Sequence, residues 1–231
     1  MIKESLIAGA VGGLLWLDRF QAFQLLIARP IVAAAIIGTL LGDLAAGMAT
    51  GILFELLWLR RPPVGGFIAP DATLASVVTA AVAANLRSGT NANLTSTVFL
   101  CFVVLLPVCF AGRKLDEKVR LQLGKLARFA AGAQADGKDT GVWPYFAAAL
   151  SMGFLAAFAF LTPVVLVATY GLSLLMPQIP PSVEKAFSFG YFVVPLVGVA
   201  DLLLGLDEKE NLILFIIGFL AAIGGSLIIR L

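Results

Sequence analysis

Short apolar runs, each ended by a charged or turn-forming pair, fill the first sixty residues. The runs 5–17, 20–28, 31–41 and 44–59 are all shorter than the roughly 20 residues that a helix needs to cross a bilayer. They end at Asp18-Arg19, Arg29-Pro30, Gly42-Asp43 and Arg60-Arg61. Half-length apolar pieces predict re-entrant or discontinuous helices, whose polar ends lie against protein rather than lipid.

The remaining runs predict further helices. Residues 72–86 are typical of a helix that begins at Asp71, and 98–112, 187–206 and 212–229 are apolar spans. Residues 142–176 are too long for one ordinary span, so a break is expected at Pro163, because proline lacks the backbone N–H. The pattern predicts an all-α integral membrane protein with about seven or eight membrane segments, including broken or re-entrant helices.

Composition agrees with this fold class. Hydrophobic residues make up 60% of the 231 residues and charged residues 13%, against roughly 25% charged residues in soluble domains. With a mean hydropathy of +1.00, the chain is expected to be solvated mainly by lipid and to cross a membrane several times. There is no histidine, the commonest general base, so we expect neither an enzyme nor a cofactor.

The two cysteines and the basic residues refine the picture. Cys101 and Cys109 are too few for a zinc site and are expected to pack in the core.

Seven of the sixteen basic residues lie between Arg113 and Lys138, which predicts a cytoplasmic loop by the positive-inside rule. Three regions follow: an N-terminal membrane region (1–112), a basic loop (113–141) and C-terminal membrane helices (142–231). Apolar residues recur every three or four positions in the loop, as in a helix lying at a membrane surface; they are Leu115, Val119, Leu123, Leu126 and Ala130.

Two carboxylates in strongly apolar sequence are the main candidates for a site. Glu55 and Asp71 flank three prolines and a Gly-Gly pair, so we expect a helix, a break over residues 60–70, and a second helix from Asp71. An ionisable group in lipid costs about 2.5–3.5 kcal/mol, so such acids usually serve a ligand or a pathway. The break would bring both carboxylates within reach of one ligand.

The order and spacing of these residues resemble a known family. Arg29-Pro-Ile-Val, Gly38-Thr-Leu-Leu-Gly-Asp43, the Glu55 helix, Pro-Val-Gly and Ala69-Pro-Asp-Ala-Thr-Leu-Ala-Ser76 follow one another. This block, residues 16 to 82, resembles the IIC membrane component of the mannose–fructose–sorbose family of the bacterial sugar phosphotransferase system. Beyond the block the likeness rests on hydropathy and the basic loop.

The resemblance implies a function and a set of partners. A IIC component pairs with a membrane component, IID, and together they move a hexose across the inner membrane. A cytosolic IIB, phosphorylated by IIA, then phosphorylates the sugar. The likeness also implies trimers of IIC–IID pairs and an elevator movement, and the lack of histidine fits phosphate carriage by the other chains. No nucleic-acid partner is expected.

The chain departs from the family in three places. Arg60-Arg61 stands where members often have glycine, and Asp201 lies in a span without a family acid. The segment from Asp18 to Arg29 is several residues longer than in some members. Either Gln21 or Gln24 can therefore face the sugar, and we favour Gln24.

Each candidate residue also has a purely structural interpretation. Glu55 would accept sugar hydroxyls or pair with Arg29 or Arg60, and Asp71 would contact sugar or simply cap a helix. Asp43 contacts sugar or closes a turn. Trp16, Trp58 and Trp143 suit the membrane interface, although a sugar can also stack on Trp58. The expected substrate-binding set is Gln24, Glu55, Asp71 and Asp43.

Two other functions remain open from sequence alone. A proton-coupled secondary transporter would use Glu55, Asp71 or Asp201 and would stop working with an uncoupler. A non-transporting scaffold of a regulatory phosphotransferase system would bind partners but move no sugar.

Overall fold

The computed structural model describes residues 1–22, 24–59, 68–90, 92–135 and 141–204, with residues 213, 216 and 217 beyond them. These residues form eight α-helices and one 3-10 turn, and no strand occurs among them. The expected span over 212–229 and the Arg60-Arg61 pair lie outside the well-described ranges. A count of seven or eight membrane segments is consistent with these helices.

Three of the four half-length pieces near the N-terminus are helices, as predicted. They are α1 (Ile2–Leu17), α2 (Pro30–Leu40) and α3 (Leu44–Trp58), and α4 (Ala72–Arg87) is the helix predicted to begin at Asp71. Of the described helices, two are long and apolar enough to cross a membrane, or three if one bent pair counts as a single span. The fourth piece, 20–28, is not helical over its described residues (all but 23) and runs through turns instead.

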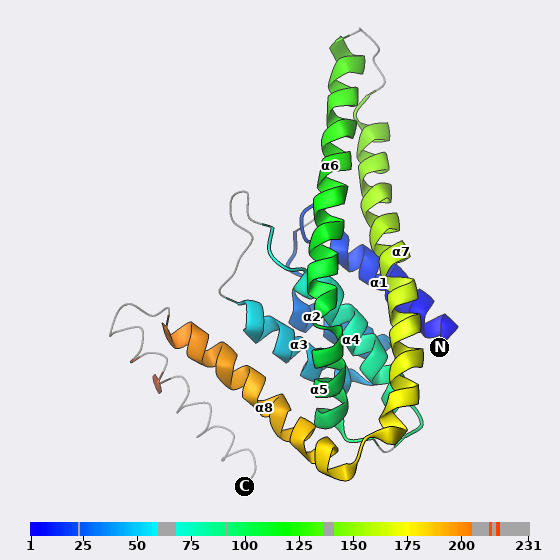
Figure 1. Cartoon of the computed structure of the whole chain (residues 1–231). Helices are drawn as coiled ribbons and strands as arrows, with labels where there is room; N and C mark the ends of the chain where they lie inside the picture. Colours follow the sequence, from blue (N-terminus) through cyan, green and yellow to red (C-terminus); the bar gives the residue numbers. More distant parts are fainter. Residues whose placement is uncertain are drawn as a thin grey trace.

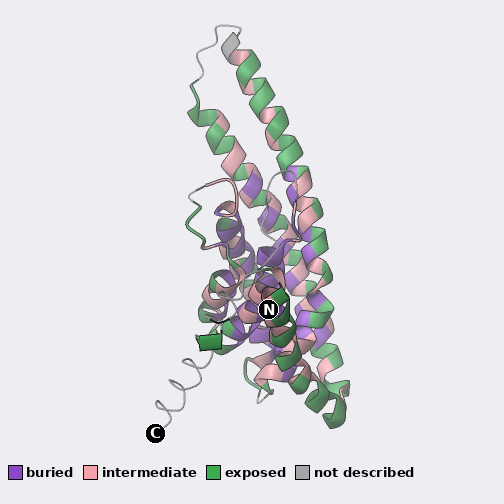
Figure 2. Cartoon of the chain, turned by 90° about the vertical axis from the view of Figure 1, so that its left-hand side faces the viewer, coloured by how far each residue is buried: buried purple, intermediate pink, exposed green. Residues whose placement is uncertain are grey.

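Helix α4 is the centre of the molecule. Every residue from Ala72 to Ala84 is buried, and α1, α2, α3, α5, α6 and α7 all contact this helix. Its small side chains let many neighbours approach closely. Figure 2 shows the buried residues gathered in the body around it, while the far ends of the long helices are mostly exposed.

The apolar run predicted over 98–112 is helical but bent. It is divided at Leu106 between α5 (Leu94–Leu105) and α6 (Pro107–Ala135), which are bent by 46° relative to each other. Proline at the start of α6 explains the division, because it cannot donate to the preceding turn. The boundary predicted at residue 112 falls inside α6, and the helix predicted within the basic stretch is part of α6.

Helix α6 projects from the body beside α7 (Trp143–Leu175), and Figure 1 shows the two rising together. Val119 is buried, and Leu115 and Leu123 pack against the core. The apolar stripe of α6 therefore has a partner within the protein. Its position relative to the membrane surface stays a prediction.

The predicted break at Pro163 is wrong, because α7 runs unbroken through it for 33 residues. At 1.5 Å per residue this is about 50 Å, well beyond the roughly 30 Å of a hydrocarbon core. Neighbouring helices let a membrane helix tolerate the missing N–H. Here α1 packs closely along α7: a Cβ on Gly9 would collide with Thr162, and one on Gly13 would lie 3.1 Å from Phe154. The absence of side chains at Gly9 and Gly13 thus permits this contact.

A second close contact joins α2 to α3. A Cβ on Gly51 would lie 2.7 Å from the Ile31 Cα, so the two backbones touch at this point. Glu55 follows one helical turn later and is thereby carried to the start of α2. After α7, a 3-10 turn (Met176–Gln178) leads to α8 (Pro181–Leu204), which begins six residues before the expected span.

We expect Gly51→Ala to destabilise the protein by about 1–3 kcal/mol, because the added methyl group overpacks a backbone contact. The measurement is the thermal unfolding midpoint of the detergent-solubilised protein. Gly171→Ala is the matched control, since nothing lies within 4 Å of a Cβ at that position. Equal midpoints for the two variants would contradict the contact.

Candidate functional site

A cavity of about 540 Å³ lies where α1 and α3 end and α2 and α4 begin. Its volume falls within the roughly 300–1,000 Å³ of small-molecule sites. The segment after α1, the end of α3 and the approach to α4 supply its wall. The lining residues are Asp18, Arg19, Gln24, Leu26, Ala28, Arg29, Pro30, Phe54, Glu55, Trp58, Leu59, Ala69, Pro70, Ala72 and Thr73.

Glu55 is in this wall, as predicted, and it is paired. Its carboxylate forms an ion pair with Arg29 and accepts a hydrogen bond from the Ile31 N–H at 3.3 Å. The Glu55 side chain is only 12% exposed, against 44% for Arg29. The structure therefore shows the ion pair that the sequence left open, and it places both partners at the cavity.

Gln24 also lines the cavity and belongs to an exposed, irregular stretch. Its φ is 52°, and that of Leu26 is 66°. A residue other than glycine in this left-handed region costs of order 1–3 kcal/mol, and such residues cluster at ligand sites. Gln21, the alternative, packs against α7 at Gly153 and is not among the lining residues. The geometry favours Gln24, and its contact with a sugar stays a prediction.

Asp18 is a cavity residue that the sequence analysis missed. It is 3% exposed, and its carboxylate accepts from the Leu25 N–H at 2.6 Å and the Ala28 N–H at 3.1 Å. One signal was available in the sequence. An acid directly after a helix opposes the helix dipole, so a carboxylate there needs other partners.

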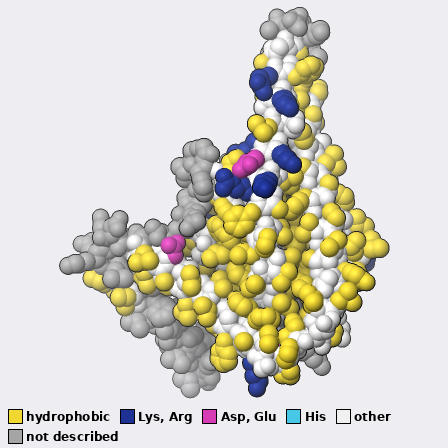
Figure 3. Space-filling model, in the orientation of Figure 1, with side chains coloured by type: hydrophobic (Ala, Val, Ile, Leu, Met, Phe, Trp, Pro, Cys, Tyr) yellow, Lys and Arg dark blue, Asp and Glu magenta, His cyan; other side chains and the backbone are white. Residues whose placement is uncertain are grey.

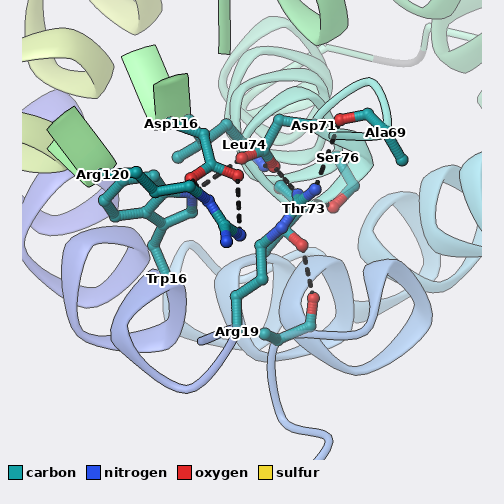
Figure 4. Close-up of polar contacts among 10 residues, drawn as sticks. Trp16, Arg19, Ala69, Asp71, Thr73, Leu74, Ser76, Asp116 and Arg120 are labelled. Atoms are coloured by element: carbon teal, nitrogen blue, oxygen red, sulfur yellow. Dashed lines mark hydrogen bonds and ion pairs between the residues drawn. The ribbon is translucent and has the colours of Figure 1, made fainter. Parts of the chain in front are cut away.

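Asp71 lies behind the cavity wall rather than in it. It caps α4, as predicted, by accepting from the Leu74 N–H at 2.9 Å. It also accepts from Trp16 Nε1 at 2.7 Å and pairs with Arg19 at 2.6 Å, with 0% of its side chain exposed. Figure 4 shows the side chains of Trp16 and Arg19 beside this carboxylate. Direct contact of Asp71 with a ligand stays a prediction.

The Asp71 cluster corrects one prediction and adds one residue. Trp16 is 0% exposed, so its expected place at the membrane interface is wrong. Its indole N–H is buried because Asp71 accepts from it. Arg19, which the sequence analysis treated as a helix end, lines the cavity while neutralising Asp71.

Asp43 is at the opposite end of α3 and outside the cavity lining. It caps α3 through the Ala46 N–H at 2.9 Å and pairs with Arg87 at 2.7 Å. The structure therefore gives it the turn-closing role and does not bring it together with Gln24 and Glu55.

The remaining candidates are Trp58 and the two cysteines. Trp58 lines the cavity and stacks on Phe54, with ring centroids 6.1 Å apart. Cys101 and Cys109 are free and buried, as expected of packing residues. Among the residues that the structure describes, no cluster of three His, Cys, Asp or Glu side chains suits a metal ion.

Comparison with known families identifies the family to which the chain belongs. Residues 2–229 match the family described as "PTS system sorbose-specific IIC component". The chain belongs to this family. Its similarity to the sorbose-specific EIIC component of Klebsiella pneumoniae is 28% identity over 212 residues, 91% of this chain and 74% of the relative.

Solved structures show the same fold. One, described as a membrane protein, has a TM-score of 0.71 at 22% identity and covers 100% of this chain and 95% of its own. The mannose transporter ManYZ in complex with microcin E492 has a TM-score of 0.60 at 21% identity, covering 100% and 94%. This IIC family member is an integral, multi-pass protein of the bacterial inner membrane.

We expect Asp71→Asn to destabilise this IIC protein by about 3–5 kcal/mol, because it leaves the buried Arg19 charge without a partner. The cap itself should survive, since asparagine caps helices well. The double variant Arg19→Gln/Asp71→Asn should cost less than the sum of the single variants. Chemical unfolding of all three in detergent measures this coupling, and additive costs would show that the pair is not coupled.

Proposed function

We propose that this chain is the sugar-permease subunit (IIC) of a mannose-family phosphotransferase system and moves a hexose across the inner membrane. The observation that carries the proposal is the cavity between the end of α3 and the start of α4, walled by Glu55 and Arg29, in a protein of the IIC family. Transporters commonly place substrate sites at interrupted membrane helices.

The charges around the cavity suit a neutral, hydroxyl-rich ligand. Glu55 is paired with Arg29, and Asp71 with Arg19, while Asp18 is satisfied by backbone N–H groups. Carboxylates and guanidinium groups in such pairs still have spare acceptor and donor capacity. Gln24 adds an amide that both donates and accepts, and Trp58 offers a ring face for stacking.

The same proposal includes partners. We assign IID as the membrane partner, trimers of IIC–IID pairs as the assembly, and IIB, charged by IIA, as the phosphoryl donor. The absence of histidine in the sequence supports phosphoryl transfer on those other chains. The chain's likeness in fold to ManYZ, a transporter with two named components, supports a membrane partner.

Phosphoenolpyruvate-dependent uptake of labelled mannose, fructose and sorbose tests the function. Cells that carry the IIA, IIB and IID components are compared with and without this chain. We expect uptake only with the chain and co-purification of an integral partner. Uptake that needs no IIB and collapses with an uncoupler would indicate a secondary transporter, and partner binding without uptake would indicate a regulatory scaffold.

Glu55→Gln should weaken sugar binding by roughly 1.5–3 kcal/mol, the range for hydrogen bonds to charged groups. The change keeps the size of the side chain while removing its charge, and the partly exposed Arg29 can be solvated by water. The apparent affinity for the transported sugar measures the loss. Glu184→Gln is the control, because Glu184 lies on α8 outside the cavity lining. Wild-type transport by a well-folded Glu55→Gln protein would make this carboxylate structural.

Helix α6 should face the cytoplasm and help to dock IIB. Figure 3 shows Lys and Arg gathered on its projecting part, where Lys114, Lys118, Lys125 and Arg128 are exposed. Basic charge can attract an acidic partner face. A cysteine at Gly132, where nothing lies within 4 Å of an added Cβ, should react with an impermeant maleimide only after the cells are opened. Labelling from outside intact cells would show that the predicted orientation of α6 is wrong.

A further inference from the structure

The segment 18–29 supplies much of the cavity wall, although its described residues (all but 23) are neither helix nor strand. Gln24, Leu26 and Arg29 of this segment all line the cavity. Two of its residues, Gln24 and Leu26, have positive φ values of 52° and 66°. L-residues avoid this region, so the segment does not hold its shape through local preference alone.

Asp18 supplies the missing constraint. One of its carboxylate oxygens accepts from the Leu25 N–H at 2.6 Å and the other from the Ala28 N–H at 3.1 Å. These two donors bracket Leu26, the residue with the larger positive φ. The carboxylate is 3% exposed, so water competes little for either bond.

Ala28 is held from its other side as well. Its carbonyl oxygen accepts from Thr73 Oγ1 at 2.6 Å, and Thr73 lies in the first turn of the buried helix α4. The segment is therefore fixed between the end of α1, through Asp18, and the start of α4, through Thr73. Arg29 follows directly and reaches Glu55 across the cavity.

We infer that Asp18 is a positioning residue for ligand binding, which fixes the segment 18–29 so that Gln24, Leu26 and Arg29 face the cavity in one arrangement. Both carboxylate oxygens are committed to backbone donors, so Asp18 acts through the segment. The inference rests on the proposed function for its ligand, a hexose. Its structural part, the fixing of the segment, is independent of that function.

Asp18→Asn is the test variant, because it keeps the size of the side chain but turns one acceptor into an NH₂ group that faces a backbone N–H. We expect the KM for phosphoenolpyruvate-dependent uptake of mannose, fructose or sorbose to rise at least tenfold. The maximal uptake rate per membrane-inserted protein should stay within about twofold of the wild-type rate. The substitution changes only the segment that contacts the ligand and leaves the rest of the transporter as it is. A KM close to the wild-type value overturns the inference, and so does a loss of maximal rate at unchanged KM.

Asp43→Asn is the matched control. Like Asp18, Asp43 is a carboxylate that accepts a backbone N–H. It differs in that it pairs with an arginine and lies outside the cavity lining. The same substitution there should leave the KM unchanged. An equal rise in KM for both variants would show a general effect of losing a carboxylate and would overturn the assignment to Asp18.

A spin label reports on the segment without any sugar. Leu25 is 67% exposed and is not a lining residue, and the native cysteines are buried, so a nitroxide on Leu25→Cys gives a specific signal. We expect the label to be markedly more mobile in the Asp18→Asn background and unchanged with Asp43→Asn. Equal mobility with and without Asp18→Asn overturns the inference. If the wild type transports none of the three sugars, the proposed function fails, and the label still decides whether Asp18 fixes the segment.

Discussion

The buried carboxylate of Asp71 is the interaction on which the rest of this structure depends. It caps the central helix α4, accepts from the Trp16 indole and neutralises Arg19. Its own backbone N–H donates to the Cys109 carbonyl at 2.8 Å, which ties the beginning of α6 to the same point. A charge in an apolar body is tolerated only when its partners are complete. The side chain of Asp71 thus joins α1 to α4, and its backbone N–H joins α6 to the same point.

The projecting helix and the cavity wall are joined through this cluster. The Arg120 guanidinium of α6 lies 4.4 Å from the centre of the Phe20 ring and is bonded to the fully buried Asp116. Phe20 in turn packs edge-on against Trp16, with ring centroids 5.2 Å apart. Phe20 belongs to the segment that walls the cavity. The surface that we propose for docking IIB and the proposed ligand site are thus connected by a continuous set of packed side chains.

The sequence predicted what depends on local chemistry. The bounds of the half-length helices follow from apolar runs and from the pairs that end them, and the cap at Asp71 follows from its position before Ala72-Thr73. Pro163 was misjudged because its tolerance depends on the neighbouring helices that support α7. Asp18 and Arg19 were missed because their partners, Leu25, Ala28 and Asp71, are brought to them by the chain's return across the start of α4. The sequence left open whether Glu55 pairs with Arg29 or Arg60. The close contact of α2 with α3, which brings Glu55 to the start of α2, favours Arg29.

A common constraint explains why the acids are where they are. Helix ends within an apolar body leave unpaired backbone groups. A carboxylate accepts from such groups at the start of α3 (Asp43), at the start of α4 (Asp71) and in the turns after α1 (Asp18). An arginine then balances the charge at Asp43 and Asp71, whereas Asp18 accepts from two backbone N–H groups. Glu55 is different, because it follows the start of its helix by three turns and meets both an arginine and a backbone N–H from another helix. Among the four acids it is the one whose position is not required by a helix start or a nearby turn, which supports its proposed contact with a ligand.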